Sequence, residues 1–582
     1  MSPREWLAAS LLLATVALAS AQQQCPPLGS ACVCDSSQYD PVGILCTNAG
    51  SLSNVLAAIS AARSVQINLL KIEDTPISRL DAFAFSGFTI NKLILNRNGL
   101  TDIDLQAFET ELVDSLLELD LRENALGQLP RASLSGLRNL QTLNVARNRI
   151  SQLAADSFAG WESATSLRKV DLSGNRLSDQ SLSGGAFRSL LALQELSLKT
   201  NAFDNVPADA LRPARDTLTK LSLGSNRISE IPIGALDFPN LDSLDLEFNG
   251  ISRIYPEALR GVPNLLSLYL TGNRFTVFEP EMLRLVPKLL RLSMGETPIQ
   301  VLPQDAFQYT PELIRLEMSE AAVDTIELGT FQRTPLIQAI ILNKNRLARI
   351  RRDMFEGLSE LYTIDLQGNQ LTEVEDGSWA NLGSLNHLDI SNNRLQLLET
   401  DTFLNSFVRS NSDRRVMFVC GNPWVCDERL DWFRDFLRAN LDIDIDKGSA
   451  GCRATCAGGP DYVPRTWPLR EPNPVQPPTT FRAPEAGPIS GAALSMLGWI
   501  ILAVILSVLI ATICLLGLMR YFMGRKHKKE KDMDAILEDE RQRTIITRST
   551  TQSVVNPSYP ASVVDLDLPP ARTLDDRPYA YL

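Results

Sequence analysis

Histidine is nearly absent from this sequence of 582 residues, and its scarcity restricts the catalytic sites that the chain could form. The two histidines are His387 and His527, so a Ser-His-Asp triad would depend on one of them. The motifs HExxH, GxSxG and GxxxxGK(S/T), which mark zinc proteases, serine hydrolases and nucleotide-binding loops, do not occur. We therefore predict a protein that is not an enzyme and that uses no metal or other cofactor.

The sequence also lacks Asn-x-Ser/Thr sites for N-linked glycans before residue 490. Two near matches, Asn405-Ser406-Phe407 and Asn411-Ser412-Asp413, fail because the third residue is neither serine nor threonine. Positive charge is in deficit too, since the formal net charge is -12. This balance argues against nucleic acid as the main partner, and the missing glycans leave the surface open to a protein.

Cysteine is rare, with nine residues, and eight of them fall into two groups of four. No histidine lies near either group, which favours disulfides over zinc sites. The ninth, Cys514, stands in a long apolar run and is predicted to be an apolar filler. The predicted disulfide cysteines are Cys25, Cys32, Cys34, Cys46, Cys420, Cys426, Cys452 and Cys456.

The N-terminal 21 residues have the features of a secretory signal peptide. Arg4 precedes an apolar run over residues 7–18, and Ala19-Ser20-Ala21 supplies small residues for cleavage. We therefore expect the chain to enter an oxidising compartment, in which disulfides persist.

The most informative stretch is residues 361–371, LYTIDLQGNQL, which fits the pattern LxxLxLxxNxL. Near-copies recur at intervals of 23–27 residues, and this periodicity predicts a protein made of stacked repeats. A second column of bulky apolar residues, ten positions after most of the asparagines, keeps the same register. The asparagine position is occupied in order by Thr75, Asn98, Asn124, Asn148, Asn175, Asn201, Asn226, Asn249, Asn273, Thr297, Ala321, Asn345, Asn369 and Asn393.

The spacing of this pattern predicts its structure. The leucines of LxL point to one face of a short strand, and neighbouring repeats must stack to bury them. Fourteen repeats therefore predict fourteen parallel strands. Each asparagine is expected to bond backbone groups of an adjacent repeat that would otherwise be buried without partners. Thr297 and Ala321 cannot supply the same amide, so we expect looser, bent or differently curved geometry there.

The repeats and the flanking cysteines resemble the leucine-rich-repeat superfamily, in its extracellular subclass with cysteine-rich caps. The resemblance implies an α/β-type solenoid, a horseshoe with a parallel concave β-sheet. It also implies the N-terminal pairs Cys25–Cys34 and Cys32–Cys46. The C-terminal cap of the family reads NPWxCDCxLxWL, but Glu428 stands where its second cysteine is expected. The pairing of the C-terminal cysteines therefore stays open.

Composition divides the chain into seven segments. A run of prolines after the second cysteine group predicts an extended, semi-rigid stalk. The predicted segments are a signal peptide (1–21), an N-terminal cysteine cap (22–64), about fourteen repeats (65–410), a C-terminal cysteine cap (411–456), a proline-rich stalk (457–492), a transmembrane helix (493–519) and a disordered cytoplasmic tail (520–582).

The segment Leu494–Met519 is predicted to cross a membrane. It contains no charged residue, and as a helix it would exceed the ~30 Å hydrocarbon core of a bilayer. Six basic residues follow between positions 520 and 531, which places this end in the cytoplasm. We therefore predict a single-pass type I plasma-membrane protein with its repeats outside. Ala503, Ser507 and Ala511 form a small-residue stripe that could pair two helices as a homodimer.

The predicted tail contains two short sequences that resemble adaptor-binding motifs. One has the form NPxY, a ligand of phosphotyrosine-binding and endocytic adaptor domains, which receive such peptides at a sheet edge. The other, at the C-terminus, resembles the sorting signal YxxΦ, and its free carboxylate could instead enter a PDZ groove. The predicted adaptor-contact residues are Asn556, Pro557 and Tyr559 in the first motif and Tyr579 and Leu582 in the second.

Apolar and aromatic side chains on the concave strands are candidate ligand contacts. The column just before the second leucine of LxL is largely acidic, and we expect its members to point to solvent. Scattered exposed apolar residues are also common on surfaces that bind nothing. The candidates are Phe248, Leu266, Tyr269, Ile341 and Tyr362.

Together these segments predict a cell-surface receptor or adhesion protein that binds an extracellular protein on its concave face and recruits cytoplasmic adaptors. Two alternatives stay open. The chain could be an accessory or trafficking subunit that binds another membrane protein through its stalk and span. It could also be a co-receptor for microbial lipid or glycan patterns, since the repeats suit many ligands.

Overall fold

The computed structural model describes residues 25–35, 42–409, 414–447 and 451–475, all within one compact unit, Met1–Pro477. The predicted signal peptide, membrane helix, tail and adaptor motifs lie outside the described residues, as does the stalk beyond residue 475. Within the described ranges, no helix combines the length and the apolar character that a bilayer crossing requires.

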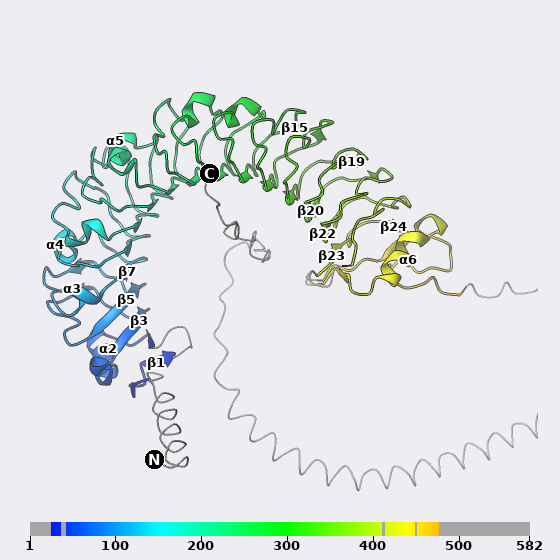
Figure 1. Cartoon of the computed structure of the whole chain (residues 1–582). Coiled ribbons are helices and arrows are strands. Elements are labelled where there is room, and N and C mark those ends of the chain that lie inside the picture. Colours follow the sequence, from blue (N-terminus) through cyan, green and yellow to red (C-terminus); the bar gives the residue numbers. More distant parts are fainter. Residues whose placement is uncertain (1–24, 36–41, 410–413, 448–450, 476–582) are drawn as a thin grey trace, which may run out of the picture. The chain divides into compact units, whose positions relative to one another are not determined.

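One sheet runs through the unit and lines its inner, concave side (Figure 1). Among the described residues it has 18 strands. They pair in chain order, and every pairing is parallel except the first, between β1 and β2. In spatial order they are β1 (Cys32–Asp35), β2 (Gly43–Thr47), β3 (Gln66–Glu73), β5 (Thr89–Asn96), β7 (Glu118–Asp120), β8 (Thr142–Asn144), β9 (Lys169–Asp171), β10 (Glu195–Ser197), β11 (Lys220–Ser222), β12 (Ser243–Asp245), β13 (Ser267–Tyr269), β14 (Arg291–Ser293), β16 (Arg315–Glu317), β18 (Ala339–Ile341), β20 (Thr363–Asp365), β22 (His387–Asp389), β23 (Val416–Phe418) and β25 (Asp444–Ile445). All fourteen predicted strands are present, β3 to β22, and each cap adds two more.

The convex side carries only short elements. Within the described repeats no helix is longer than four residues, so the α part of the predicted α/β solenoid is slight. Small strand pairs replace helices in several repeats: β4 (Arg79–Leu80) with β6 (Asp102–Ile103), β15 (Val301–Leu302) with β17 (Thr325–Ile326), and β19 (Arg349–Ile350) with β21 (Glu373–Val374). The repeat helices are α3 (Leu112–Ser115), α4 (Arg131–Leu134), η2 (Glu162–Thr165), α5 (Ala208–Leu211), η3 (Arg212–Ala214), η4 (Pro256–Leu259) and η5 (Pro280–Leu283).

The core lies between these two layers. The leucines of the LxL motifs point away from the concave face and are fully buried, as Ile364 and Leu366 illustrate. In most repeats the bulky residue ten positions after the asparagine position packs against them from the convex side. Phe307, Phe331 and Phe355 form a stack with ring centroids 5.8 and 6.1 Å apart. The apolar wedge of each repeat is thus closed only by its neighbours, which is why the repeats fold together.

Asn369 shows how each asparagine joins two repeats. Its Nδ2 donates to Leu366 O in its own turn and to Leu342 O in the preceding repeat, both at 2.9 Å. Its Oδ1 accepts from Leu347 N at 3.1 Å. The expected ladder is therefore confirmed, and its bonds reach backwards along the chain. The same arrangement occurs at Asn148, Asn175, Asn201, Asn226, Asn249, Asn273, Asn345, Asn393 and, in the C-terminal cap, Asn422.

The ladder is interrupted at Thr297 and Ala321, as the sequence predicts. The Thr297 hydroxyl donates within its own turn, to Met294 O at 2.8 Å, and the alanine has no polar side chain. The strand register nevertheless continues without a shift through β13, β14, β16 and β18. The Phe278 ring meets Phe307 at 5.4 Å and so extends the aromatic stack across the interruption. Apolar packing on the convex side thus holds together the repeats that lack the amide.

Replacing Asn369 with alanine is expected to lower the free energy of unfolding by about 2 kcal/mol, because buried backbone groups in two repeats lose their partners. Urea unfolding followed by circular dichroism measures this loss. Thr297→Ala is the matched control, since that hydroxyl bonds only within its own turn, and it should cost clearly less. Equal losses in the two variants would show that the cross-repeat bonds contribute nothing specific.

The N-terminal cap covers the open end of the first repeat. Its β1–β2 hairpin joins the main sheet through β3, and the helices α2 (Leu52–Ala58) and η1 (Ser60–Ser64) follow. Two disulfides hold the cap together, Cys25–Cys34 and Cys32–Cys46. This is the pairing that the family resemblance implies.

An aromatic cluster in the C-terminal cap covers the last repeat. Helix α6 (Asp431–Ala439), which follows η6 (Glu428–Leu430), brings Phe433 and Phe436 within 6.1 and 5.6 Å of the Phe403 ring. Beneath them Trp424 is fully buried, and its Nε1 donates to Val419 O at 2.8 Å. The disulfides are Cys420–Cys452 and Cys426–Cys456, which resolves the pairing that the sequence left open.

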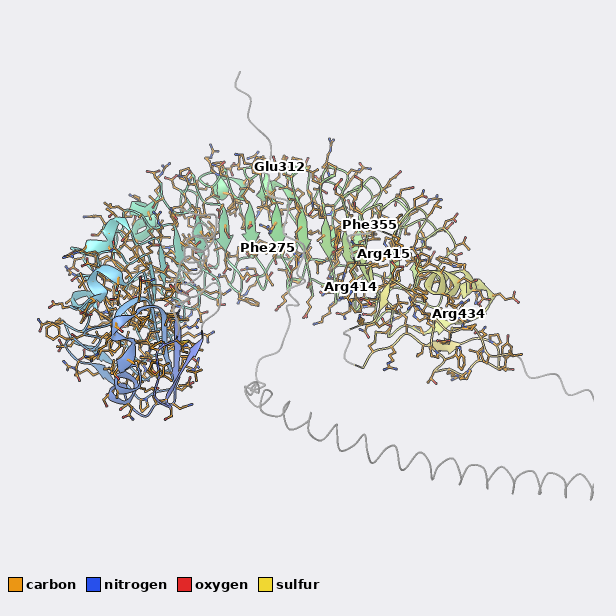
Figure 2. All side chains as sticks on the ribbon, turned by 60° about the horizontal axis from the view of Figure 1, so that its bottom comes forward. Phe275, Glu312, Phe355, Arg414, Arg415 and Arg434 are labelled. Carbon is orange, nitrogen blue, oxygen red and sulfur yellow. A yellow bond between two sulfur atoms is a disulfide. The ribbon has the colours of Figure 1, made fainter. Side chains whose placement is uncertain are left out.

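Residues 457–473 continue this cap, although the sequence predicts the stalk from residue 457. They begin within β26 (Cys456–Gly458), which pairs with β24 (Trp424–Val425), and then return to α6. Arg434, labelled in Figure 2, is 1% exposed and donates to Leu469 O at 3.0 Å, to Asn473 Oδ1 at 2.6 Å and to Glu471 O. The folded cap therefore extends at least to Asn473, past the predicted boundary at 456.

Candidate functional site

A groove of about 480 Å³ lies on the concave face and spans five neighbouring strands, β9 to β13. The groove is recessed because small side chains occupy strand positions that face the concave side. These are Ser197, Ser222 and Ser243, which we call the serine floor. The parallel register sets Ser222 opposite Asp245 and Asp245 opposite Tyr269 on successive strands. Tyr269 therefore lines one end of the groove, beside the serine floor and a carboxylate.

Charged side chains form one row along the groove. Glu195 lies between two lysines, with its carboxylate oxygens 3.2 Å from Lys169 Nζ and 2.7 Å from Lys220 Nζ. The hydrogen bond from Lys220 holds the pKa of Glu195 below its usual value. This row holds two positive charges against one negative charge, so every carboxylate in it is paired before any ligand binds.

A second row, closer to Tyr269, has more negative than positive charge. Lys199 Nζ lies 3.3 Å from Asp245 Oδ2 and 3.6 Å from Glu247 Oε2, so one ammonium serves two carboxylates. Ser222 Oγ also donates to Asp245, at 2.6 Å. Burial raises the pKa of Glu247, and the neighbouring Asp245 charge raises it further. The groove is therefore suited to non-covalent recognition of a polar, cationic group.

The predicted ligand contacts fall in different places. Tyr269 lines the groove, and Leu266, which is partly buried, directly precedes the strand β13. Phe248 is 45% exposed, and its ring lies over Gly272, where a Cβ atom would come within 2.4 Å of Phe248 Cδ1. Tyr362 is partly buried and does not line the groove, since it directly precedes β20, four strands beyond β13.

Ile341 is 6% exposed, so its side chain does not offer the solvated anchor that the sequence predicts. The acidic column also departs from the expectation that it points to solvent. Asp120 is 6% exposed, and Asp245 is hydrogen-bonded to Ser222. The physical reason is that a concave strand residue is covered by side chains of adjacent repeats, which curve toward it. Facing the concave side therefore does not guarantee exposure.

The charged rows were not predicted from the sequence. Lys169, Glu195 and Lys220 occupy the same strand position in three consecutive repeats, and parallel pairing aligns them. Their alternating charge is the signal that could have revealed the first row. Glu247 is harder to find, because its burial depends on the side chains around it.

A separate acidic pair lies near the C-terminal end of the sheet. Asp365 is opposite Asp389 on neighbouring strands, so two like charges adjoin. Burial raises the pKa of Asp389 to about 7, and the charge of Asp365 adds to the effect. Burial also raises the pKa of Asp365 itself. Burial and the like charge of Asp365 thus disfavour the ionised form of Asp389.

His387 lies on β22 and packs against the ring of a residue on the next strand. Its ring lies 5.8 Å from that of Phe418, and burial lowers its pKa. In the part of the chain that the structure describes, no group of three or more histidine, cysteine or acidic side chains is placed to hold a metal ion.

Comparison with known proteins finds the same kind of repeat in other proteins. The family model described as leucine rich repeat matches residues 88–150, 114–177, 216–275 and 335–395. Podocan-like protein 1 from Homo sapiens is 33% identical over 215 residues, which make up 36% of this chain and 40% of that protein. Transforming growth factor beta activator LRRC33 from Danio rerio is 27% identical over 177 residues, 29% of this chain and 25% of that protein.

A solved structure has the same fold. It is a leucine-rich-repeat protein from Leptospira interrogans, with a TM-score of 0.50 and 21% identity over 67% of this chain and 98% of that chain. Identity this low supports the fold alone. The matches to the two curated relatives span less than half of either relative's length.

Proposed function

We propose that this chain, a solenoid of leucine-rich repeats closed by disulfide-bonded caps, is a cell-surface protein that binds an extracellular protein through its concave face. The observation that carries this proposal is the groove over β9–β13, where a serine floor, two rows of charge and Tyr269 meet. Groove-lining polar groups beside an aromatic ring are the usual means of specific protein recognition. One relative is itself named for its action on a growth factor, which is consistent with a protein ligand.

The proposed topology is that of a single-pass type I protein at the plasma membrane. Four disulfides support an oxidising compartment for the repeats. The uncharged run Leu494–Met519 and the basic residues after it support a membrane anchor with a cytoplasmic tail. Its NPxY sequence, Asn556–Tyr559, would recruit a phosphotyrosine-binding or endocytic adaptor.

Tyr269→Ala is expected to weaken binding of the soluble ectodomain, residues 22–490, to partner-bearing cells by about tenfold, because a groove-lining aromatic side chain is lost. Flow cytometry with a concentration series of labelled ectodomain measures the apparent dissociation constant.

Tyr255→Ala is the matched control, because Tyr255 is 51% exposed but lies outside the groove, where Arg253 stacks on its ring. This variant should bind like the unaltered ectodomain. If Tyr255→Ala weakened binding and Tyr269→Ala did not, the concave groove would not be the binding surface. An ectodomain that recovered only cytosolic proteins would contradict the topology.

A further inference from the structure

The charges that line the groove do not balance. Four carboxylates line it, those of Asp171, Glu195, Asp245 and Glu247, but only two lysines do. Both lysines are engaged by Glu195. The second row therefore has one shared cation, Lys199, for two carboxylates. A ligand that supplied positive charge at this end would complete the row.

The two carboxylates of this row differ in how fully they are used. Asp245 Oδ2 accepts from Ser222 Oγ, and its Oδ1 accepts from Glu247 N at 3.0 Å. Glu247 has a weaker set of partners, with Lys199 Nζ at 3.6 Å and a hydrogen bond from the Thr271 hydroxyl. Asp245 and Glu247 are two residues apart, so both side chains point to the concave face. Glu247 is the carboxylate with the most capacity left for a new donor.

Tyr269 provides the second half of a recognition site. It is the register partner of Asp245, so its ring stands one strand away from the carboxylates. A carboxylate beside an aromatic face suits a planar guanidinium, which can stack on the ring while it donates paired hydrogen bonds. An ammonium makes the charge contact but cannot stack in the same way.

We propose that the groove receives an arginine side chain of the partner protein, with Glu247 as the main hydrogen-bond acceptor, Asp245 as the second carboxylate and Tyr269 as the stacking surface. This inference rests on the proposed function, since it names the chemistry that the same groove recognises. The partner would therefore present an exposed, arginine-bearing segment, and its binding would weaken as salt concentration rises.

The test uses the purified full-length chain and fluorescein-labelled tetra-arginine, tetra-lysine and tetra-glutamate peptides, with fluorescence anisotropy as the readout. Tetra-arginine should bind about threefold or more tightly than tetra-lysine, because only guanidinium groups stack. Tetra-glutamate should not bind. Glu247→Gln should weaken tetra-arginine binding about tenfold, and Tyr269→Ala should do the same, whereas Tyr269→Phe, which keeps the ring, should retain most of it.

Glu312→Gln is the matched control. Glu312 is an exposed carboxylate outside the groove, so this variant changes the net charge of the chain by the same amount (Figure 2). It should bind tetra-arginine like the unaltered chain. The thermal unfolding midpoint of Glu247→Gln should be unchanged or higher, since burial already disfavours the charged form of Glu247. If Glu247→Gln lowers both the midpoint and the binding, its loss of binding is attributed to misfolding. The comparison of Tyr269→Ala with Tyr269→Phe then decides the proposal.

Three outcomes would overturn the proposal. One is equal weakening by Glu312→Gln and Glu247→Gln, which indicates attraction by net charge alone. Another is equal binding of tetra-arginine and tetra-lysine together with no effect of Tyr269→Ala. The third is no saturable binding of tetra-arginine at millimolar concentration. If cell binding still depends on Tyr269 in any of these cases, the concave-face function stands and only the arginine inference fails.

Discussion

Replacing Arg434 with methionine is expected to lower the free energy of unfolding by about 3 kcal/mol, because a buried carbonyl group and two partly buried acceptors lose their donor. The guanidinium donates to Leu469 O and Glu471 O, and also to Asn473 Oδ1. Methionine fills much of the same volume but offers no hydrogen bond. Urea unfolding of the disulfide-intact protein measures the loss, and limited proteolysis should show faster cleavage within residues 457–475.

Arg429→Met is the matched control in the same cap. Arg429 is an exposed arginine paired with Asp427 at 2.7 Å, a contact of the kind that contributes about 0–1 kcal/mol. Equal losses from Arg429→Met and Arg434→Met would mean that the segment after residue 456 does not depend on the buried guanidinium. Unchanged proteolysis of Arg434→Met would lead to the same conclusion.

Asp389→Asn is expected to stabilise the protein at about pH 8 by roughly 2–4 kcal/mol, since it removes a charge that burial and Asp365 disfavour. Its hydrogen bonds survive, because Asp389 Oδ1 is the atom that accepts from Ser391 N and Ser391 Oγ, and an amide oxygen can replace it. Urea unfolding at a series of pH values measures the difference between the variant and the unaltered chain.

The sign of the pH dependence follows from the raised pKa. Folding raises the pKa of Asp389 from 3.8 to about 7, so the folded state binds the proton more tightly than the unfolded chain. The stabilisation from protonated Asp389 is complete below about pH 4 and is lost as the pH rises to about 7. The gain from Asp389→Asn should therefore grow over this window and level off above it. Asp401→Asn, at an exposed position, should give a flat difference. A flat difference for Asp389→Asn as well would show that its carboxylate is not disfavoured.

The repeats were predictable because their information is local and repeated. Leucine spacing within a single turn defines which side chains face the core, and the recurring asparagine defines the register between turns. All fourteen strands follow from these two features. The cap disulfides Cys25–Cys34 and Cys32–Cys46 followed from the family resemblance, which the structure bears out.

The features that were missed depend on contacts between distant residues. The cap boundary required knowing that Arg434 reaches Leu469 and beyond, across 35 residues of sequence. The burial of Ile341 and the raised pKa of Asp389 depend on the size of side chains in adjacent repeats. The groove likewise exists because Ser197, Ser222 and Ser243 bring small side chains to three neighbouring strands, and no single repeat contains that information.

The two missing amides at Thr297 and Ala321 divide the solenoid into blocks held by different forces. Elsewhere, neighbouring turns are joined by both hydrogen bonds and apolar contact. At this seam, cohesion rests more heavily on the rings of Phe278, Phe307 and Phe331. Apolar attraction weakens on cooling. This part of the arc, which begins at the repeat next to the groove, is therefore where a drop in temperature loosens the molecule first.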